Sequence, residues 1–444
     1  MSEDTVFALS SPVGGAIAIA RITGSGAYAA LMRVFRCKNA PEHRVMNYGH
    51  VTDPESGETI DSAMACFLKA PATYTGEDMA EIYIHGSRVI AKRTLSVLSR
   101  FLRPAEGGEF TKRAFMNGKL DLSQAEAVMD VISSVTEQGA RMAEEQLAGS
   151  IGSGIKDIED RLIDILSGVE AALDYPDELE EDTVSSLENE LVPIIDKLDY
   201  LIRGGNAARI FREGASVAIL GAPNAGKSSL FNALMGTERA IVTSIPGTTR
   251  DTLEETLDIC GAPVRITDTA GIREGADEAE RIGVERARKA GERADLILIA
   301  IDGTKPIDEE SRALIDAARR GEYRKCLILF TKADKQGFGT DENCAEFAPI
   351  SISSVTGEGI EELKERMAAL LLTKEAESAL VTNSRHIHAL AEAKAALETA
   401  DAAMGTDLAA ADIRTALYAL GQITGREVTS DVIERIFSRF CVGK

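Results

Sequence analysis

The stretch SVAILGAPNAGKSSLFNALMG, residues 216–236, predicts a strand, a glycine-rich loop and a helix in direct succession. The loop, GAPNAGKS at 221–228, matches the phosphate-binding pattern G-x-x-x-x-G-K-S/T. In such a loop, backbone N–H groups and the positive end of the following helix face phosphate oxygens. Lys227 would add a charge at the β- and γ-phosphates, and Ser228 would offer its hydroxyl to Mg²⁺. The alternative is a strand–helix turn that happens to contain a lysine, and the order of the motifs that follow argues against it.

Two further motifs follow in the order expected of a nucleotide site. DTAG at 268–271 ends a strand, where Asp268 would hold Mg²⁺ through water and the N–H of Gly271 would reach a γ-phosphate. Between the two loops lies PGTTRD at 246–251, in which Thr249 is the natural second Mg²⁺ ligand of a switch segment. The residues predicted to contact nucleotide in these loops are Asn224, Ala225, Gly226, Lys227, Ser228, Ser229, Gly247, Thr249, Asp268, Thr269, Ala270 and Gly271.

The motif TKAD, 331–334, indicates which base is bound. Asp334 can accept hydrogen bonds from N1–H and N2–H₂ of guanine together, and adenine has no such pair of donors. Thr331 stands where Asn is usual, which weakens one contact to the base. A last base-contacting loop follows the strand FAPISI, where the backbone N–H of Ser354 replaces that of the commoner Ala. These two loops add Thr331, Lys332, Ala333, Asp334, Ser353, Ser354 and Val355 to the predicted site, which is therefore a GTP-binding domain.

The residue that orients the attacking water is less evident. Small signalling GTPases have a Gln directly after the DTAG-like motif, and this chain has Ile272, which cannot orient water. A polar group from the following REGADEAERIG must then reach in, and the candidates are Arg273, Glu274, Glu280 and Arg281. An exposed, charged switch helix without a catalytic residue is the open alternative.

The composition limits the classes to which the chain can belong. It has 444 residues, 44% of them hydrophobic, which favours about two to four globular domains. Its formal net charge of −22 argues against non-specific coating of nucleic acid. Residues 1–120, with 14 Lys and Arg against 12 Asp and Glu, would repel a polyanion least. Six scattered cysteines, no basic secretory leader and only strand-sized apolar runs predict reduced thiols, a cytoplasmic location and no membrane contact.

Three kinds of pattern divide the chain. Residues 1–119 alternate strand-like runs with turns and one amphipathic helix, which predicts an α+β domain. Residues 120–212 and 376–444 carry apolar stripes at helical spacing, and we expect them to pack together as one all-α domain. Residues 213–375 contain five strand-like runs with helices between them. The predicted fold class is a multidomain chain in which an α/β P-loop domain interrupts a helical domain.

Two breaks are expected within the first helical segment. The acidic stretch DYPDELEEDT, 174–183, contains Pro176 and predicts a solvated loop. A helix then resumes at LENELVPIIDKLDYLIR and is expected to end at Gly204 and Gly205.

With these motifs in place, the chain resembles, nearly end to end, the tRNA modification GTPases called MnmE or TrmE. The resemblance rests on YTGEDMAEIYIHG (74–86), GEFTKRAFMNGKLDLSQAEAVMD (108–130), DTAGIREGADEAERIG (268–283) and the terminal FCVGK (440–444). It implies a folate-binding N-terminal domain that dimerises, a helical domain and an inserted G domain. It also implies a K⁺-stimulated GTPase that acts with the flavoprotein MnmG on tRNA. Together they would add an aminomethyl-type group to C5 of the wobble uridine, using a one-carbon unit from a 5,10-methylene- or 5-formyl-tetrahydrofolate type folate.

The resemblance also assigns ions and a catalytic residue in the G domain. Glu280 matches the residue that positions the hydrolytic water, which fills the gap left at Ile272. A K⁺ ion beside the nucleotide would neutralise phosphate charge as an arginine finger does elsewhere. Its implied ligands are the side chain of Asn224 and the backbone of Thr243, Ile245 and Thr248, next to the Mg²⁺ ligands Ser228 and Thr249. The same loop brings Ser244 and Pro246 to the nucleotide, where other members often have Asp and Ala.

For the N-terminal domain, the resemblance implies a folate site drawing on Arg21, Glu81, Lys119 and the C-terminal Lys444. A positive group suits the glutamate tail of folate and a carboxylate suits the N–H donors of the pterin. Taken alone, Arg21 and Glu81 are better explained as surface residues. Cys441 matches a family cysteine and is a candidate catalytic residue. We prefer the interpretation that it helps form the pocket in which folate and the wobble base meet, and a small residue packed in the tail is the other alternative.

Other functions stay open at this point. A GTPase switch in ribosome assembly would have a similar P-loop domain with an RNA-binding module such as a KH domain, and no suitable GXXG loop or basic tail is found. A stand-alone folate aminomethyltransferase leaves the GTP motifs unexplained. Basic side chains of the first domain are either a contact for tRNA or MnmG or, as we prefer, a solvated face: Arg88, Lys92, Arg93, Arg100 and Arg103.

Overall fold

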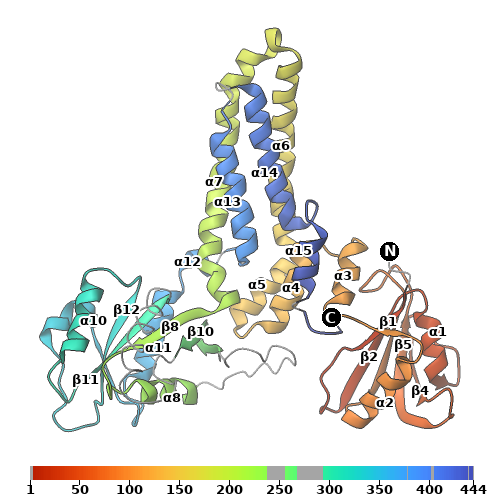
Figure 1. Cartoon of the computed structure of the whole chain (residues 1–444), viewed down its shortest axis with the longest axis horizontal. Coiled ribbons are helices and arrows are strands. Elements are labelled where there is room, and N and C mark those ends of the chain that lie inside the picture. Colours follow the sequence, from red (N-terminus) through yellow and green to blue (C-terminus); the bar gives the residue numbers. More distant parts are fainter. Residues whose placement is uncertain are drawn as a thin grey trace.

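The computed structural model of the chain describes residues 4–237, 256–267, 294–377, 379–401, 405–438 and 440–443. A tall group of helices stands between a sheet domain formed by the N-terminal part and a second sheet domain formed by the middle of the chain (Figure 1). The multidomain fold class predicted from the sequence is confirmed.

The N-terminal part is a seven-stranded sheet with two helices on one face. The strand order is β3-β4-β5-β6-β2-β1-β7, with antiparallel pairing except between β1 and β7. Apolar residues of α1 and α2 pack on one face, while the other face exposes Met46, Tyr48 and Met64. The elements are β1 (Val6–Leu9), β2 (Ile17–Thr23), α1 (Ala27–Val34), β3 (Phe35–Cys37), β4 (Met46–Thr52), β5 (Thr59–Leu68), β6 (Met79–His85), α2 (Arg88–Leu98), β7 (Arg103–Pro104) and α3 (Glu109–Met116).

The helical part is built from both ends of the chain. Its first segment holds α4 (Leu122–Ser133), α5 (Glu137–Leu147), α6 (Ser150–Asp174) and α7 (Pro176–Glu213), and its second holds α12 (Lys374–Glu377), α13 (Ser384–Thr399), α14 (Thr406–Thr424) and α15 (Ser430–Phe437). One apolar core joins residues 151–201 of the first segment to residues 381–423 of the second. The predicted packing of the two helical segments against each other is therefore confirmed.

Two expected breaks in this part are wrong. Residues 176–183 are helical, because α7 begins at Pro176 directly after α6 ends. The N–H of the first helical residue has no partner within the helix, so a proline, which lacks this N–H, is tolerated there. Acidic residues are favourable near the N-terminus of a helix because that end carries partial positive charge. The helix also continues through Gly204 and Gly205. A Cβ on Gly205 would lie 2.9 Å from Cγ1 of Ile387, so this glycine allows a close approach of α13.

The C-terminal tail returns to the N-terminal part. Val442 forms an isolated β-bridge with Gly107, and the N–H of Gly108 donates to the carbonyl of Cys441 (3.2 Å). Phe437 and Phe440 pack into a small cluster with Leu122 of α4. Residue 441 thus lies beside Gly108, which directly precedes α3.

The inserted part is a six-stranded sheet in the order β13-β12-β11-β8-β10-β9, parallel except for β9. Separate apolar clusters cover its two faces, as expected of a doubly wound domain. All five predicted strand runs are present, and β9 was missed. The elements are β8 (Ala215–Leu220), α8 (Lys227–Thr237), β9 (Thr256–Ile259), β10 (Ala262–Thr267), β11 (Leu296–Asp302), α10 (Glu309–Arg319), β12 (Cys326–Thr331), the 3₁₀ helix η1 (Glu342–Phe347), β13 (Ile350–Ile352) and α11 (Ile360–Leu371).

Among the residues that the structure describes, no helix combines the length and the apolar character needed to span a bilayer.

Candidate functional site

The predicted phosphate loop joins the central strand β8 to helix α8, whose first residue is Lys227. Gly221 at its start has no room for a side chain, because a Cβ there would lie 2.2 Å from the carbonyl oxygen of Ala300. Gly226 has φ +90° and Asn224 has φ +63°, both in the left-handed region that turns the backbone sharply. Nζ of Lys227 donates to the carbonyl oxygens of Gly221 (2.7 Å) and Ala222 (2.9 Å). The lysine is thus held over the loop at the N-terminus of α8.

The predicted base loop is fastened to this phosphate loop. Thr331 Oγ1 donates to the carbonyl oxygen of Ala225 (2.7 Å), and Nζ of Lys332 donates to that of Asn224 (2.8 Å). Lys332 also pairs with Asp302 at the end of β11 (2.6 Å). Although burial opposes ionisation, this partner and the Thr304 hydroxyl lower the pKa of Asp302 to about 2. The structure therefore brings together two motifs that are separated by about a hundred residues of sequence.

A buried serine holds the predicted base-recognising carboxylate. Oγ of Ser353 donates to Oδ1 of Asp334 (2.7 Å), and the N–H of Ala333 donates to the carbonyl of Ile352 (3.1 Å). The bond from Ser353 holds the pKa of Asp334 below its usual range. Asp334 is exposed while Ser353 is buried, so the carboxylate is held by a buried hydroxyl and remains accessible to a ligand. Ser354 and Val355 follow at the same edge of the sheet, where Val355 is exposed.

Several predicted nucleotide and ion ligands lie outside the described residues. They are Thr243, Ser244, Ile245, Pro246, Gly247, Thr248, Thr249, Asp268, Thr269, Ala270 and Gly271, together with Glu280. Of the predicted Mg²⁺ and K⁺ ligands, Ser228 and Asn224 are described, and both are exposed, as is Ser229.

A second cluster lies on the face of the N-terminal sheet opposite to α1 and α2. Arg21 on β2 and Glu81 on β6 are directly opposite in register, and Nε of Arg21 donates to Oε1 of Glu81 (2.9 Å). The Tyr83 hydroxyl donates to the other carboxylate oxygen of Glu81 (2.5 Å). Burial and the bond to this carboxylate raise the pKa of Tyr83 to about 12. The Arg21 guanidinium lies over the ring of Phe110, 5.8 Å from its centre.

The other predicted folate residues have different surroundings. Lys119 is exposed, and its Nζ donates to the carbonyl of Pro71 (3.2 Å). Cys441 is half-buried, with a free thiol, beside the loop that precedes α3. Lys444 lies outside the described residues.

Comparisons with known proteins cover nearly the whole chain. The family model for the GTP-binding protein TrmE N-terminus matches residues 5–119, and the MnmE helical domain model matches residues 122–441. The tRNA modification GTPase MnmE of Natranaerobius thermophilus is 39% identical over 100% of both chains. That of Acetivibrio thermocellus is 41% identical over 100% of this chain and 99% of its own. The chain belongs to the MnmE family of tRNA modification GTPases.

Membership of the MnmE family argues against both other functions left open above, because the match spans the full length of the relatives. Among solved structures, the G domain of the FeoB iron transporter of T. maritima is 32% identical, with a TM-score of 0.27. That match covers 35% of this chain and 98% of that one.

Three residues near the Arg21–Glu81 pair of this MnmE-family chain were missed. Tyr83 follows Glu81 by two residues on β6 and so lies on the same face, a signal that the alternation of strand residues offered. Phe110 of α3 lies far from Arg21 in sequence, and only the tertiary fold brings them together. Tyr74, whose hydroxyl lies 2.8 Å from that of Thr111, also follows from the fold alone.

Most of the five basic side chains singled out in the first domain form ion pairs within that domain. Arg93 pairs with Glu58, Arg100 pairs with Asp53, and Arg103 pairs with Asp4 and Glu109. These pairs favour the solvated ionic face that we preferred over a nucleic-acid contact.

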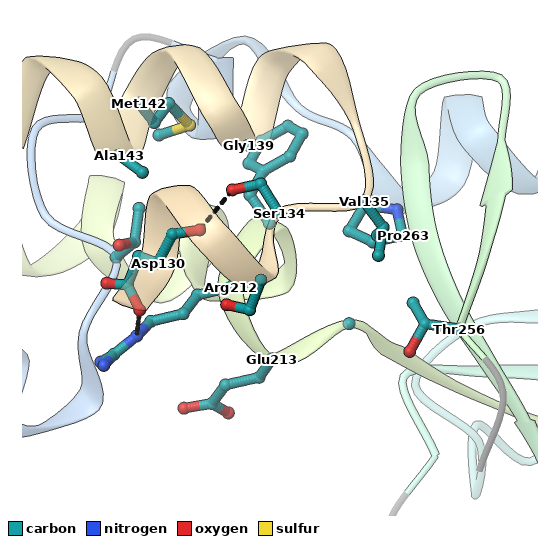
Figure 2. A pocket seen from close by; sticks show the side chains of 14 residues that line it. Asp130, Ser134, Val135, Gly139, Met142, Ala143, Arg212, Glu213, Thr256 and Pro263 are labelled. Atoms are coloured by element: carbon teal, nitrogen blue, oxygen red, sulfur yellow. Dashed lines mark hydrogen bonds and ion pairs between the residues drawn. The ribbon is translucent and has the colours of Figure 1, made fainter. Parts of the chain in front are cut away.

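A small pocket of about 70 Å³ lies where the helical part meets the inserted domain. Figure 2 shows Asp130 of α4 facing Arg212 in the last turn of α7, with Thr256 and Pro263 of the inserted domain on the other side. Nε of Arg212 donates to Oδ1 of Asp130 (2.8 Å). Burial raises the pKa of Asp130 against the opposing effect of Arg212. The pocket is separate from both clusters above, and it marks the junction at which α7 leads into β8.

Proposed function

We propose that this chain is a K⁺-stimulated GTPase that works with the flavoprotein MnmG. Together they would add an aminomethyl-type group to C5 of the wobble uridine of certain tRNAs, using a folate one-carbon unit. The observation that carries the proposal is the fastening of the TKAD loop to the P-loop, in a chain that matches MnmE relatives from end to end.

In the nucleotide site, the P-loop would bind the phosphates of GTP through its backbone N–H groups and Lys227. Mg²⁺ would be held by Ser228, at the start of α8, and by Thr249. Asp334, ionised and held by Ser353, would accept from N1–H and N2–H₂ of guanine. The left-handed turn at Asn224 leaves its side chain exposed beside the P-loop, which fits the proposed K⁺ ligand.

A K⁺ ion, when bound, would supply positive charge at the phosphates, and Glu280 would orient the attacking water during hydrolysis. The backbone of Thr243, Ile245 and Thr248 would complete the K⁺ site. Each round of hydrolysis would then reorder residues 243–251 and 271–285, which is the expected route by which the G domain signals to the rest of the dimer.

The Arg21–Glu81–Tyr83 cluster fits a ligand with both N–H donors and acceptor groups. Glu81 is held by two donors and remains partly exposed. Arg21 uses Nε for Glu81, and its two Nη groups have no hydrogen-bond partner among the described residues. We infer that folate binds here, that Lys119 and Lys444 would contribute to the same site, and that Cys441 would help form the pocket in which folate and uridine meet.

We further propose domain limits of 1–119, 120–212, 213–375 and 376–444, and a homodimer formed through the N-terminal domain. The exposed apolar side chains on β4 and β5, Met46, Tyr48 and Met64, support a covered sheet face.

The deciding experiment measures GTP hydrolysis by the purified chain in KCl and in NaCl, with the Glu280→Ala variant beside the wild type. We expect strong stimulation by K⁺ and its collapse in the variant. Removal of a water-positioning group slows chemistry by about 10²–10⁴-fold. GDP affinity, measured by titration, should be unchanged in the variant, because Glu280 would act on the water.

A slow rate that is indifferent to K⁺ and to Glu280 would contradict the proposed mechanism. An activating protein partner would then be needed to explain hydrolysis. Loss of wobble-uridine modification when the gene is deleted tests the tRNA part of the proposal independently of the GTPase rate.

A further inference from the structure

Thr331 stands where the base loop of GTP-binding domains usually has Asn, and the structure shows how its hydroxyl is used. Thr331 ends β12, and the residue is only 2% exposed. Oγ1 lies 2.7 Å from the carbonyl oxygen of Ala225 in the P-loop and 3.1 Å from that of Ile301 at the end of β11. A Cβ on Gly226 would lie 3.3 Å from the same oxygen, so the P-loop backbone rests directly against Thr331.

These contacts exhaust the donor capacity of the side chain. A hydroxyl has one proton, and both neighbours at hydrogen-bond distance are carbonyl oxygens, which only accept. An asparagine amide has two N–H donors and can serve a P-loop carbonyl and an acceptor on the base at once. Thr331 makes the first kind of contact and has no proton for the second.

The neighbouring side chain is also directed at the P-loop. Lys332, with φ +66°, donates to the carbonyl of Asn224 and pairs with Asp302. Residues 331 and 332 therefore support the P-loop at two consecutive carbonyls. Among the described residues of the base loops, this leaves Asp334, which Ser353 holds in place, as the side chain available to recognise guanine.

We propose that Thr331 is a specificity-determining residue: it braces the P-loop and leaves N7 of guanine without a side-chain donor. Guanine offers the acceptors N7 and O6 on one edge and the donors N1–H and N2–H₂ on another. The site then distinguishes nucleotides by the donor edge alone and accepts GTP analogues that lack the N7 acceptor. This inference rests on the proposed GTP binding and defines which nucleotides the site accepts.

The test is calorimetric titration of the full chain, with Mg²⁺, against GTP, 7-deaza-GTP and ITP. In 7-deaza-GTP a C–H replaces N7, and we expect the wild type to bind it within about two-fold of GTP, since no hydrogen bond is lost. ITP lacks the N2 amino group and should bind at least about ten-fold more weakly, because the lost hydrogen bond ends on the ionised carboxylate of Asp334. The ITP result shows that the assay resolves a single lost contact.

Two variants test the role of Thr331 itself. Thr331→Asn supplies the missing donor, so we expect it to bind 7-deaza-GTP about five-fold more weakly than GTP. Thr331→Val keeps the shape but removes the brace, so we expect it to weaken GTP and 7-deaza-GTP by the same factor.

A wild type that discriminates about five-fold against 7-deaza-GTP would overturn the proposal. A folded Thr331→Asn variant that binds GTP and 7-deaza-GTP equally would also overturn it. If that variant does not fold, the other two proteins decide. Discrimination against 7-deaza-GTP by the wild type, or unequal weakening of GTP and 7-deaza-GTP in Thr331→Val, would overturn the proposal. Equal binding of GTP and ITP by the wild type would refute the proposed guanine site instead, and the inference would fall with it.

Discussion

Asp334 shows how a single exposed carboxylate can be prepared for its ligand. A carboxylate free to rotate would lose conformational entropy on binding guanine, and the bond from the buried Ser353 removes much of that freedom beforehand. The same bond holds the pKa of Asp334 below its usual range, so the group is ionised throughout the neutral range. Ser353 itself has no solvent exposure and also accepts from the N–H groups of Val355 and Thr356.

We expect Ser353→Ala to weaken GDP binding by about five-fold at neutral pH, because one net hydrogen bond that orients the carboxylate is lost. The pH dependence should shift as well. At the proposed site, guanine binding would require ionised Asp334 and would be lost as the pH falls through its pKa. Since Ser353 lowers that pKa, the variant should lose GDP affinity at a higher pH than the wild type. Titrations with a fluorescent GDP analogue at several pH values measure both effects.

Ser351→Ala, two residues earlier on β13, is the matched control and should bind GDP like the wild type. An unchanged pH profile in Ser353→Ala would show that Ser353 does not control the ionisation of Asp334.

The sequence predicted the P-loop and the base loop because each is a local motif whose spacing carries its chemistry. The fastening of one loop to the other was not predictable, since hydrogen bonds between Thr331 and Ala225 depend on how β8 and β12 are placed in the sheet. Likewise, Arg21 and Glu81 looked like ordinary surface residues until the antiparallel register of β2 and β6 set them opposite each other.

Helix α4 contacts the chain on both sides of the inserted domain. Asp130 pairs with Arg212, just before the insertion, and Glu126 pairs with Arg385, just after it, with Nη2 to Oε2 at 2.7 Å. His386 adds a contact of 2.8 Å to the same oxygen of Glu126. Burial lowers the pKa of His386 against the opposing effect of Glu126. Two carboxylates one helical turn apart on α4 thus form ion pairs with the segments that precede and follow the inserted domain.

We expect Glu126→Gln to lower the free energy of unfolding by about 2–4 kcal/mol, because Arg385 keeps a mostly buried charge without its partner. Although burial opposes ionisation, bonds from His386 and Arg385 hold the pKa of Glu126 below its usual range. Its stabilisation is therefore present above the unfolded pKa of about 4.5 and is lost as the pH falls further. Urea unfolding measures the free energy of unfolding of both proteins, and the difference between wild type and variant in this free energy should become smaller toward acid pH.

Glu144→Gln, at an exposed position of α5, is the control and should change stability by less than about 0.5 kcal/mol. If the difference in free energy of unfolding between Glu126→Gln and the wild type stays constant from neutral to acid pH, ionised Glu126 is not the cause of that difference.

Helix ends were less predictable than helix existence for a physical reason. Gly204 and Gly205 favour an end by their own conformational freedom, yet close packing against α13 and the segment before it stabilises the continued helix. Pro176 was misread in the same way, because a proline that stops one helix can begin the next. In both cases the deciding contact or position lies outside the local pattern.

The whole molecule is organised around an insertion whose two ends lie together. Phe211 in the last turn of α7 and Ala376 of α12 share one small apolar cluster, with Leu372 at its edge. The main helical core contains no residue between 214 and 372. The helical part therefore has its own core. If the inserted domain were absent, only a short distance would separate the two chain ends at Phe211 and Ala376.

We expect a chain in which a short Gly/Ser linker replaces residues 214–372 to keep the helical part folded, since short flexible loops cost little to close. Circular dichroism should show a strong helical signal and a cooperative thermal transition. A gradual, non-cooperative loss of helix would contradict this expectation and show that the core needs the inserted domain. GTP binding must be absent in this chain.

The split helical core also has a consequence for biosynthesis. Helices α6 and α7 leave the ribosome before the inserted domain, and their partners α13 and α14 follow about 170 residues after Glu213. At about 5–20 residues per second, the apolar faces of α6 and α7 wait on the order of ten to thirty seconds for the helices that cover them. During that interval the nascent chain exposes half of its largest core, so its yield in the cell should depend on chaperones that shield apolar surfaces during translation.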